Sequence, residues 1–274
     1  MLPGPHARLN HALRKHSPRP WLALAGLLLA SSCPVWAQTS VLTYHNDIDR
    51  TGANTRETIL TPANVNPAQF GKLFSQTVDG DVYAQPLYMP AVVIAGRGAH
   101  NVVFVATEAD SVYAFDADSK DGSNSSPLWH ASLIDSTHGA APGATPVKIP
   151  AELGCFAILP QVGITSTPVI DPASGTLYVE AFSKEHGAFV HRLHALDIVS
   201  GAEKSGSPVT VTAALQRKGQ TSVTFDALHQ LNRPGLLLSN GTIYLAYGSH
   251  CDKPQNYGWL LAFDASTLSQ KGSF

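Results

Sequence analysis

The chain has 274 residues, of which 14% are charged and 44% hydrophobic, with 22 Gly and 19 Pro. This length fits one large domain or two small ones. The hydrophobic fraction excludes an intrinsically disordered chain, and a formal net charge of −2 with no block of like charges after residue 20 argues against a nucleic-acid-binding surface. Low charge and many turn-forming residues favour a turn-rich all-β protein over a helical bundle.

Residues 1–37 have the pattern of an export signal. A stretch at 6–20 contains basic residues and no acid, and it precedes ten uncharged, mostly apolar residues at 21–30. Ten residues are too few for a transmembrane helix, which needs about twenty. Small residues at positions 35 and 37 fit a signal-peptidase site, which predicts Gln38 as the mature N-terminus.

Cys33 offers a second interpretation of the same region. The sequence Ala-Ser-Ser-Cys that ends at Cys33 resembles a lipoprotein box, although Ala30 stands where that motif prefers Leu. A lipid anchor at Cys33 is therefore the alternative to cleavage before Gln38. Both interpretations predict an exported chain, whether periplasmic, cell-surface or secreted, without a transmembrane span in its mature form.

Two cysteines follow the signal, Cys155 and Cys251. In an oxidising compartment they are able to form one disulfide, which would close a loop of about a hundred residues and stabilise the chain by roughly 4 to 5 kcal/mol. Two buried free thiols are the alternative.

One motif, Ala-apolar-Asp at the end of a strand, occurs three times in the chain. The copies are at 114–116, 195–197 and 262–264, and a Pro that begins an apolar strand precedes each of them, at positions 86, 168 and 234. Because these two independent markers recur at nearly the same spacing, they indicate true repeats.

Each repeat predicts four short antiparallel strands. The motif lies in the third strand, and hairpins of β-branched and aromatic residues around Gly, Asn and Asp turns supply the strands before it. The predicted first strands are 85–94, 167–170 and 234–238, the second strands are 101–107, 176–181 and 242–247, and the fourth strands are 127–133 and 207–213, with that of the third repeat only begun.

Repeated four-stranded meanders predict a β-propeller, in which each sheet is a blade that packs against its neighbours. We expect about three blades, near 85–133, 167–213 and 234–274, in an incomplete ring within residues 70–274. A polar lead-in at 38–69 precedes them, a strand at 70–78 is predicted to close the ring with a last blade, and 134–163 is a large insert.

The stretches 112–129 and 193–204 resemble the repeat of pyrroloquinoline quinone (PQQ)-like β-propellers of the quinoprotein alcohol dehydrogenase-like superfamily. That repeat has Ala-x-Asp, a short turn and a Trp on the fourth strand. The stretch 44–54 is similar to the Arg-Thr-Gly opening of many members. The resemblance covers residues 44–274 and implies a fold more specifically than an activity.

The shared residues have a structural explanation. Side chains alternate along a strand, so Ala114 and Asp116 face one side and Phe115 the other. A small Ala allows close approach by a neighbouring sheet, and the resemblance assigns Trp129 as the docking residue. The Asp accepts N–H bonds from the following turn. The equivalent residues are Ala195, Asp197, Ala262 and Asp264; the second repeat has Gly201 but no Trp on its fourth strand.

The resemblance also implies PQQ, a bound calcium ion and a catalytic Asp, often with adjacent paired cysteines, but the sequence contains no Cys-Cys pair. Asn46, Asp47 and Asp49 have oxygen ligands for a cation, yet they fit turn capping better. His191 and His194 lie three apart on a strand, which points them to opposite faces. Residues 249–251, Ser-His-Cys, lack the geometry of a nucleophile and its base.

These residues predict an exported, non-catalytic binding or scaffold module with no catalytic residue assigned. Its partner is an unidentified protein, peptide or carbohydrate, or another copy that associates through open blade edges. The alternative is a fragment of a PQQ- and calcium-dependent quinoprotein dehydrogenase, in which case the chain is an oxidoreductase. No cofactor is certain, and PQQ and calcium rest on the resemblance alone.

Overall fold

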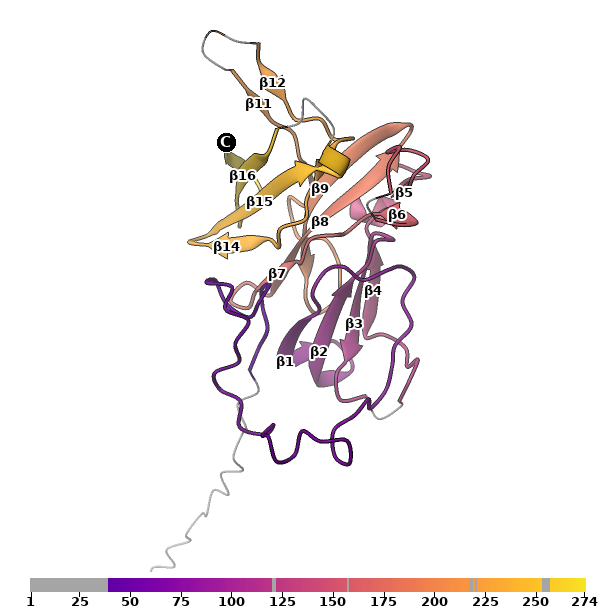
Figure 1. The fold of residues 1–274 in the computed structure, drawn as a ribbon, viewed down its shortest axis with the longest axis vertical. Helices are drawn as coiled ribbons and strands as arrows, with labels where there is room; N and C mark the ends of the chain where they lie inside the picture. Colours follow the sequence, from indigo (N-terminus) through magenta and orange to yellow (C-terminus); the bar gives the residue numbers. More distant parts are fainter. Residues whose placement is uncertain (1–38, 120–121, 157, 217–218, 220, 253–256) are drawn as a thin grey trace, which may run out of the picture. The chain divides into compact units, whose positions relative to one another are not determined.

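The computed structural model describes residues 39–119, 122–156, 158–216, 219, 221–252 and 257–274 (Figure 1). The predicted export signal at 1–37 and Cys33 lie outside the described residues. Within the described part of the chain, no helix has the length and apolar character needed to cross a membrane.

The first sheet is a meander in which each strand pairs antiparallel with the next. Its strands are β1 (Leu87–Ile94), β2 (Gly98–Ala106), β3 (Ser111–Asp116) and β4 (Trp129–Ser132) (Figure 1). These are the four strands predicted for the first repeat.

The second sheet repeats this order and extends beyond it. Strands β7 (Val169–Asp171), β8 (Thr176–Glu185), β9 (Ala188–Asp197) and β10 (Val209–Thr210) form the meander. The far end of β8 also pairs with β5 (Thr145–Lys148), which pairs with β6 (Gln161–Val162). The predicted insert therefore adds strands to this sheet.

The third sheet contains all four strands of a repeat. They are β14 (Leu237–Ser239), β15 (Thr242–Ser249), β16 (Trp259–Asp264) and β17 (Gln270–Ser273), and β13 (Gln230–Leu231) pairs with the far end of β15. The fourth strand, expected to be only begun, is therefore formed as β17. The remaining short elements are β11 (Ala214–Leu215), β12 (Val223–Thr224), η1 (Ser136–His138) and η2 (His250–Asp252).

The two faces of each sheet pack against different neighbours because side chains alternate along the strands. In the first sheet, Val102 and Phe104 face the second sheet, whose Leu177 and Val179 return the contact. The opposite face of the second sheet, which includes Tyr178, packs on the third sheet. The hydrophobic core thus consists of two layers between three sheets.

Trp129 joins the first sheet to the second. Its indole Nε1 donates a hydrogen bond of 2.9 Å to the carbonyl of Ile198, the residue that follows the repeat Asp of the second sheet. Its ring lies on the backbone of Gly201, where a Cβ would approach Cε3 of Trp129 to 2.6 Å and where φ is +74°. Glycine is therefore required there for both space and conformation.

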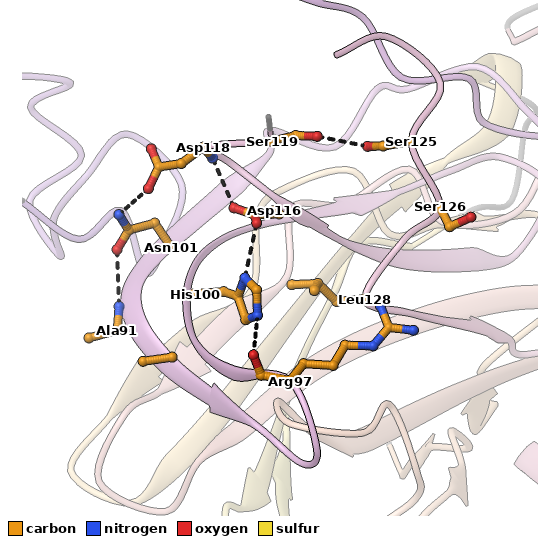
Figure 2. A pocket seen from close by; sticks show the side chains of 11 residues that line it. Ala91, Arg97, His100, Asn101, Asp116, Asp118, Ser119, Ser125, Ser126 and Leu128 are labelled. Carbon is orange, nitrogen blue, oxygen red and sulfur yellow. Dashed lines mark hydrogen bonds and ion pairs between the residues drawn. The ribbon is translucent and has the colours of Figure 1, made fainter. Parts of the chain in front are cut away.

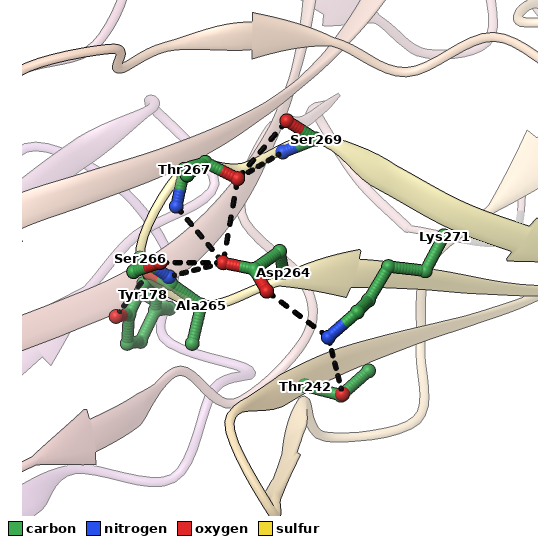
Figure 3. A network of polar contacts seen from close by, with 8 residues as sticks. All are labelled: Tyr178, Thr242, Asp264, Ala265, Ser266, Thr267, Ser269 and Lys271. Carbon is green, nitrogen blue, oxygen red and sulfur yellow. Dashed lines mark hydrogen bonds and ion pairs between the residues drawn. The ribbon is translucent and has the colours of Figure 1, made fainter.

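Tyr178 joins the second sheet to the third, where the sequence offered no Trp. Its hydroxyl donates a 2.7 Å hydrogen bond to the carbonyl of Ala265, which follows the repeat Asp264 just as Ile198 follows Asp197 (Figure 3). Tyr178 lies on the second strand of its sheet rather than the fourth. The missing Trp is thus replaced by a Tyr from a different strand that binds the equivalent carbonyl.

The lead-in contacts all three sheets. Val41 forms a bridge with Tyr88 of β1, and the N–H of Ile170 in β7 donates to the carbonyl of Leu42 at 2.8 Å. Arg50 donates to the carbonyl of Leu236 at 3.0 Å, just before β14. One short segment therefore crosses the first strands of successive sheets.

The segment 70–78, predicted as a strand that closes the ring, is not a strand. Its backbone bonds go to a loop of the first sheet instead: the N–H of Ser75 donates to Oγ of Ser123 at 3.0 Å, and the N–H of Asn124 donates to the carbonyl of Ser75 at 2.8 Å. One of these two bonds goes to a side chain rather than to a backbone carbonyl, so no ladder forms.

The insert has its own small core, and a disulfide ties it to the third sheet. Val147, Ile149 and Leu153 pack with Phe182 near the far end of β8. The sulfurs of Cys155 and Cys251 are bonded to each other. The insert is therefore fixed on the loop side of the second and third sheets.

The two junctions predict how strongly each aromatic donor stabilises the fold. We expect Tyr178→Phe to lower the free energy of unfolding by about 1 kcal/mol, because it leaves the Ala265 carbonyl without its donor. Trp129→Phe should cost about 2 kcal/mol, since it also loses contact with the Gly201 backbone. Urea denaturation measures both. Tyr83→Phe, at a half-exposed ring, is the control, and equal effects at all three positions would contradict the assignment.

Candidate functional site

The repeat Asp carboxylates are used to cap the turns that follow them. Asp197 accepts the N–H of Ser200 at 3.1 Å. Asp264 accepts the N–H of Ser266 at 2.9 Å and pairs with Lys271 at 3.0 Å (Figure 3). The Ser266 hydroxyl and the Lys271 ammonium hold the pKa of the Asp264 carboxyl well below its usual range. These carboxylates are therefore occupied by their own turns.

A pocket of about 760 Å³ lies beside the repeat Asp of the first sheet (Figure 2). This volume is within the range of small-molecule sites. Three segments line it: the β1–β2 hairpin, the turn after β3 and the segment before β4. The polar lining residues are Arg97, His100, Asn101, Asp116, Asp118, Ser119, Ser125 and Ser126, with Ala91, Ala99 and Leu128 as apolar neighbours.

His100 is held between two hydrogen-bond acceptors (Figure 2). Its Nδ1 lies 2.9 Å from Oδ2 of Asp116, and its Nε2 lies 3.0 Å from the carbonyl of Arg97. Both ring nitrogens of His100 are therefore engaged by groups of the protein, which fixes the orientation of the ring.

The other polar groups of the pocket are oriented by one another. The amide of Asn101 donates to Asp118 at 2.5 Å and accepts the N–H of Ala91 at 3.2 Å. Ser119 donates to Ser125 at 3.1 Å. The Ser119 hydroxyl is thus turned toward a second hydroxyl rather than toward a base that would activate it. The pocket presents fixed donors and acceptors, which suits binding of a polar ligand.

Two buried carboxylates lie in the loop between β2 and β3. Oε2 of Glu108 accepts the N–H of Gly163 at 2.8 Å and the hydroxyl of Thr165 at 3.1 Å. Burial raises the pKa of Glu108 to about 7. Asp110 is fully buried, and burial and the neighbouring Glu108 raise the pKa of its carboxyl well above the usual range. Both groups therefore favour their protonated forms.

Gly163 is the residue that allows the insert to approach these acids. A Cβ at this position would lie 2.7 Å from the carbonyl of Glu108 and 2.8 Å from Oδ1 of Asp110. Among the described residues, neither oxygen of Asp110 has a partner at ordinary hydrogen-bond geometry. The carboxyl of Asp110 is thus enclosed but not neutralised by a cation.

The acidic loop does not fit the quinone that the resemblance implies. PQQ is a tricarboxylate, and the groups that act on Asp110, namely Glu108, Glu180 and Asp79, are acidic and supply no cation to pair with it. Within the described ranges, no three His, Cys, Asp or Glu side chains are grouped as ligands for a metal ion.

The predicted cation candidates near the N-terminus cap a turn in the structure. Asp47 accepts the N–H of Thr51 at 3.1 Å and also binds its hydroxyl. These bonds lower the pKa of Asp47. Asn46 and Asp49 belong to the same turn region, so the arrangement agrees with turn capping.

The histidines of β9 contact different carboxylates. Nδ1 of His191 lies 2.6 Å from Glu180, and Nδ1 of His194 lies 2.7 Å from Glu203. His250, between Ser249 and the disulfide-bonded Cys251, is fully buried beside Phe182, and burial lowers its pKa to about 4. None of these groups is brought to the pocket beside Asp116.

Sequence reasoning singled out Asp116 but missed the residues that surround it. Arg97, His100 and Asn101 lie in a hairpin turn and the strand after it, where polar residues are common. The only sequence signal was the polar character of residues 97–101 on an otherwise apolar hairpin. Their convergence on Asp116 depends on the pairing of β2 with β3, in which Val102 lies opposite Asp116.

The fold is similar to two solved quinohemoprotein alcohol dehydrogenases. ADHIIG from Pseudomonas putida HK5 aligns over 86% of this chain with a TM-score of 0.51 and 16% sequence identity. The enzyme from Comamonas testosteroni aligns over 86% with a TM-score of 0.52 and 18% identity. Neither a protein-family model nor a curated protein sequence matches the chain.

These neighbours establish the fold class. The three sheets are blades of a partial β-propeller, as the repeats predicted. The chain covers 26% and 27% of the lengths of the two dehydrogenases. It therefore spans about a quarter of each, and at this identity the likeness concerns the fold alone.

Glu108 predicts a specific dependence of stability on pH. Its pKa in the folded protein is about 7, compared with 4.5 for the unperturbed group, so the folded state holds more protons between these values. Stability is then full below about pH 4.5 and falls as the pH rises toward 7. At about 1.4 kcal/mol per pKa unit, Glu108 accounts for a loss of roughly 3 kcal/mol by pH 7.

Glu108→Gln removes this titration, so the variant should not lose stability between pH 4.5 and 7 at this position. The free energy of unfolding of the variant, minus that of the natural chain, should therefore increase over this range. Urea denaturation at several pH values measures it. Asp49→Asn, at an exposed carboxylate, is the control and should give a flat difference. A flat difference for Glu108→Gln would be inconsistent with a buried carboxyl of raised pKa.

Proposed function

We propose that this chain is an exported β-propeller module that binds a neutral oligosaccharide in the pocket beside Asp116 and does not catalyse a reaction. The observation that carries this proposal is the placement of His100, whose two ring nitrogens lie against Asp116 and the Arg97 carbonyl. Both nitrogens are thus engaged by groups of the protein, whereas a general base must reach a proton of its substrate.

The chemistry of the pocket favours a sugar over an ion. Arg97 and Asn101 provide donors, while Asp116 and Asp118 provide acceptors, so the lining carries charges of both signs. Sugar hydroxyls both donate and accept hydrogen bonds and match such a mixture. Apolar Ala99 and Leu128 are suited to the C–H faces of a sugar ring.

Export is supported by the disulfide between Cys155 and Cys251. Disulfides persist in oxidising compartments and are rare in the cytosol. The N-terminal signal pattern points the same way, either with cleavage before Gln38 or with a lipid anchor at Cys33.

Calorimetric titration with a panel of neutral oligosaccharides tests the function. Asn101→Ala should weaken binding about tenfold, because each hydrogen bond lost from a site costs about 1 kcal/mol and Asp118 also loses its partner. Asn54→Ala, in the exposed lead-in, is the matched control and should bind normally. The proposal is wrong if no neutral sugar binds, or if Asn101→Ala leaves the affinity unchanged.

A fragment of a quinone-dependent dehydrogenase is the second candidate, and the fold likeness to two quinohemoprotein alcohol dehydrogenases favours it. On this interpretation, PQQ and calcium together should raise the melting temperature and shift the quinone absorption band. Addition of each component alone is the control. If neither readout changes, this second candidate is excluded for this chain.

A further inference from the structure

We propose that the disulfide between Cys155 and Cys251 is a redox switch for the turn η2. While the bond is intact, η2 keeps His250 buried; when a dithiol reduces the bond, η2 opens and the imidazole of His250 reaches solvent. The switch lies where the insert meets the third sheet, and it does not depend on the proposed function of the pocket beside Asp116.

The disulfide is accessible to a reductant. Cys251 is exposed and Cys155 is half-buried, and exposed disulfides tend to be the labile or regulatory ones. A thiolate of the dithiol attacks one sulfur, and the second thiol then displaces the mixed disulfide. The dithiol is thereby oxidised to a disulfide, while Cys155 and Cys251 each gain an electron and a proton and become thiols.

The disulfide holds η2 in a strained conformation. The backbone angle φ is +58° at Cys251 and +47° at Asp252, a left-handed region that residues other than glycine rarely adopt. Such residues persist only where other contacts hold them. Both side chains are exposed, so packing restrains them little. The bond to Cys155, 96 residues away in an insert with its own core, supplies the restraint.

His250 is unfavourably placed inside the closed turn. Its side chain is fully buried, and its ring stacks on Phe182 with the ring centroids 5.7 Å apart. Within the described ranges, neither ring nitrogen has a hydrogen-bond partner. A buried polar group without a partner costs free energy that contact with water would restore. The closed turn therefore stores both backbone strain and an unsatisfied imidazole.

The surroundings of His250 also disfavour its charged form. The elements packed around it carry the following titratable groups: Glu180, Lys184 and His191 on the Phe182 face of β8 and β9, Asp226 and His229 before β13, Tyr247 of β15, Glu152 of the insert and Asp252 of η2. Burial, and then the neighbouring His191 and His229, lower the pKa of His250 from its ordinary 6.5 to about 4.

Opening of η2 is therefore linked to pH. Between pH 6.5 and 4 the open turn binds more protons than the closed turn, so acid favours the open turn. Compared with pH 7.5, the equilibrium constant for opening should be about 30-fold larger at pH 5 and about 300-fold larger below pH 4. Reduction removes the covalent restraint, and acid then drives the turn open.

Hydrogen exchange of the full chain tests the proposal, because the N–H of His250 donates to the carbonyl of His229 at 2.9 Å and is protected only in the closed turn. Reduction with dithiothreitol should lower the protection of this amide at least about tenfold at pH 5. In the reduced chain, protection corrected for intrinsic exchange rates should be about 30-fold lower at pH 5 than at pH 7.5. The amides of β3 should stay protected.

Variants separate the contributions of the disulfide and the histidine. Cys155→Ser combined with Cys251→Ser should behave as the reduced chain. Addition of His250→Phe, which keeps an aromatic ring on Phe182 but cannot be protonated, should remove the pH dependence. His130→Phe, at an exposed histidine, is the matched control and should preserve it. Circular dichroism verifies folding, and the data on the reduced natural chain are decisive if the serine variants do not fold.

Three results would overturn the proposal. The first is equal protection of the His250 amide in the oxidised and reduced chains at both pH values. The second is a pH response that persists after His250→Phe. The third is loss of protection in β3 together with η2, since this would show that reduction unfolds the whole chain rather than one turn.

Discussion

In the second and third sheets, the carbonyl after the repeat Asp accepts a hydrogen bond from an aromatic side chain of the preceding sheet, and this bond connects the two sheets. The Asp carboxylate binds N–H groups of the turn, as Asp197 does with Ser200, and this fixes the direction of the carbonyl that follows it. The donor then enters from the neighbouring sheet and is buried, so that the carbonyl is satisfied without water. Both apolar layers of the core form around such a contact.

The sequence was sufficient to predict the blades, because the repeated Ala-apolar-Asp motif marks the turn after the third strand of each sheet. It was insufficient to predict how the sheets are joined. In the sequence, Tyr178 looks like any aromatic residue of a strand. Its contact with the next sheet can be inferred only when its position opposite Ala195 is known. The segment 70–78 was misjudged for a related reason: its strand pattern is local, but a strand also needs a partner on at least one side.

The candidate site illustrates a second limit of sequence reasoning. Asp116 was recognised as a turn residue, and in the structure one of its oxygens does bind the turn, while the other holds His100. A structural residue therefore also orients the pocket. Glu108 and Asp110 differ from Asp116: they were not singled out in the sequence, and their burial favours protonated carboxyls enclosed by the insert. Only burial and partners separate the two cases.

The position of Arg50 has a consequence for the order in which the chain folds during synthesis. Its guanidinium binds the carbonyls of Gly235 and Leu236, which are 185 and 186 residues further along the chain. The partners of Arg50 emerge from the ribosome only after the first two sheets have been made. Those sheets therefore assemble before Arg50 is anchored, and long-range contacts of this kind slow folding.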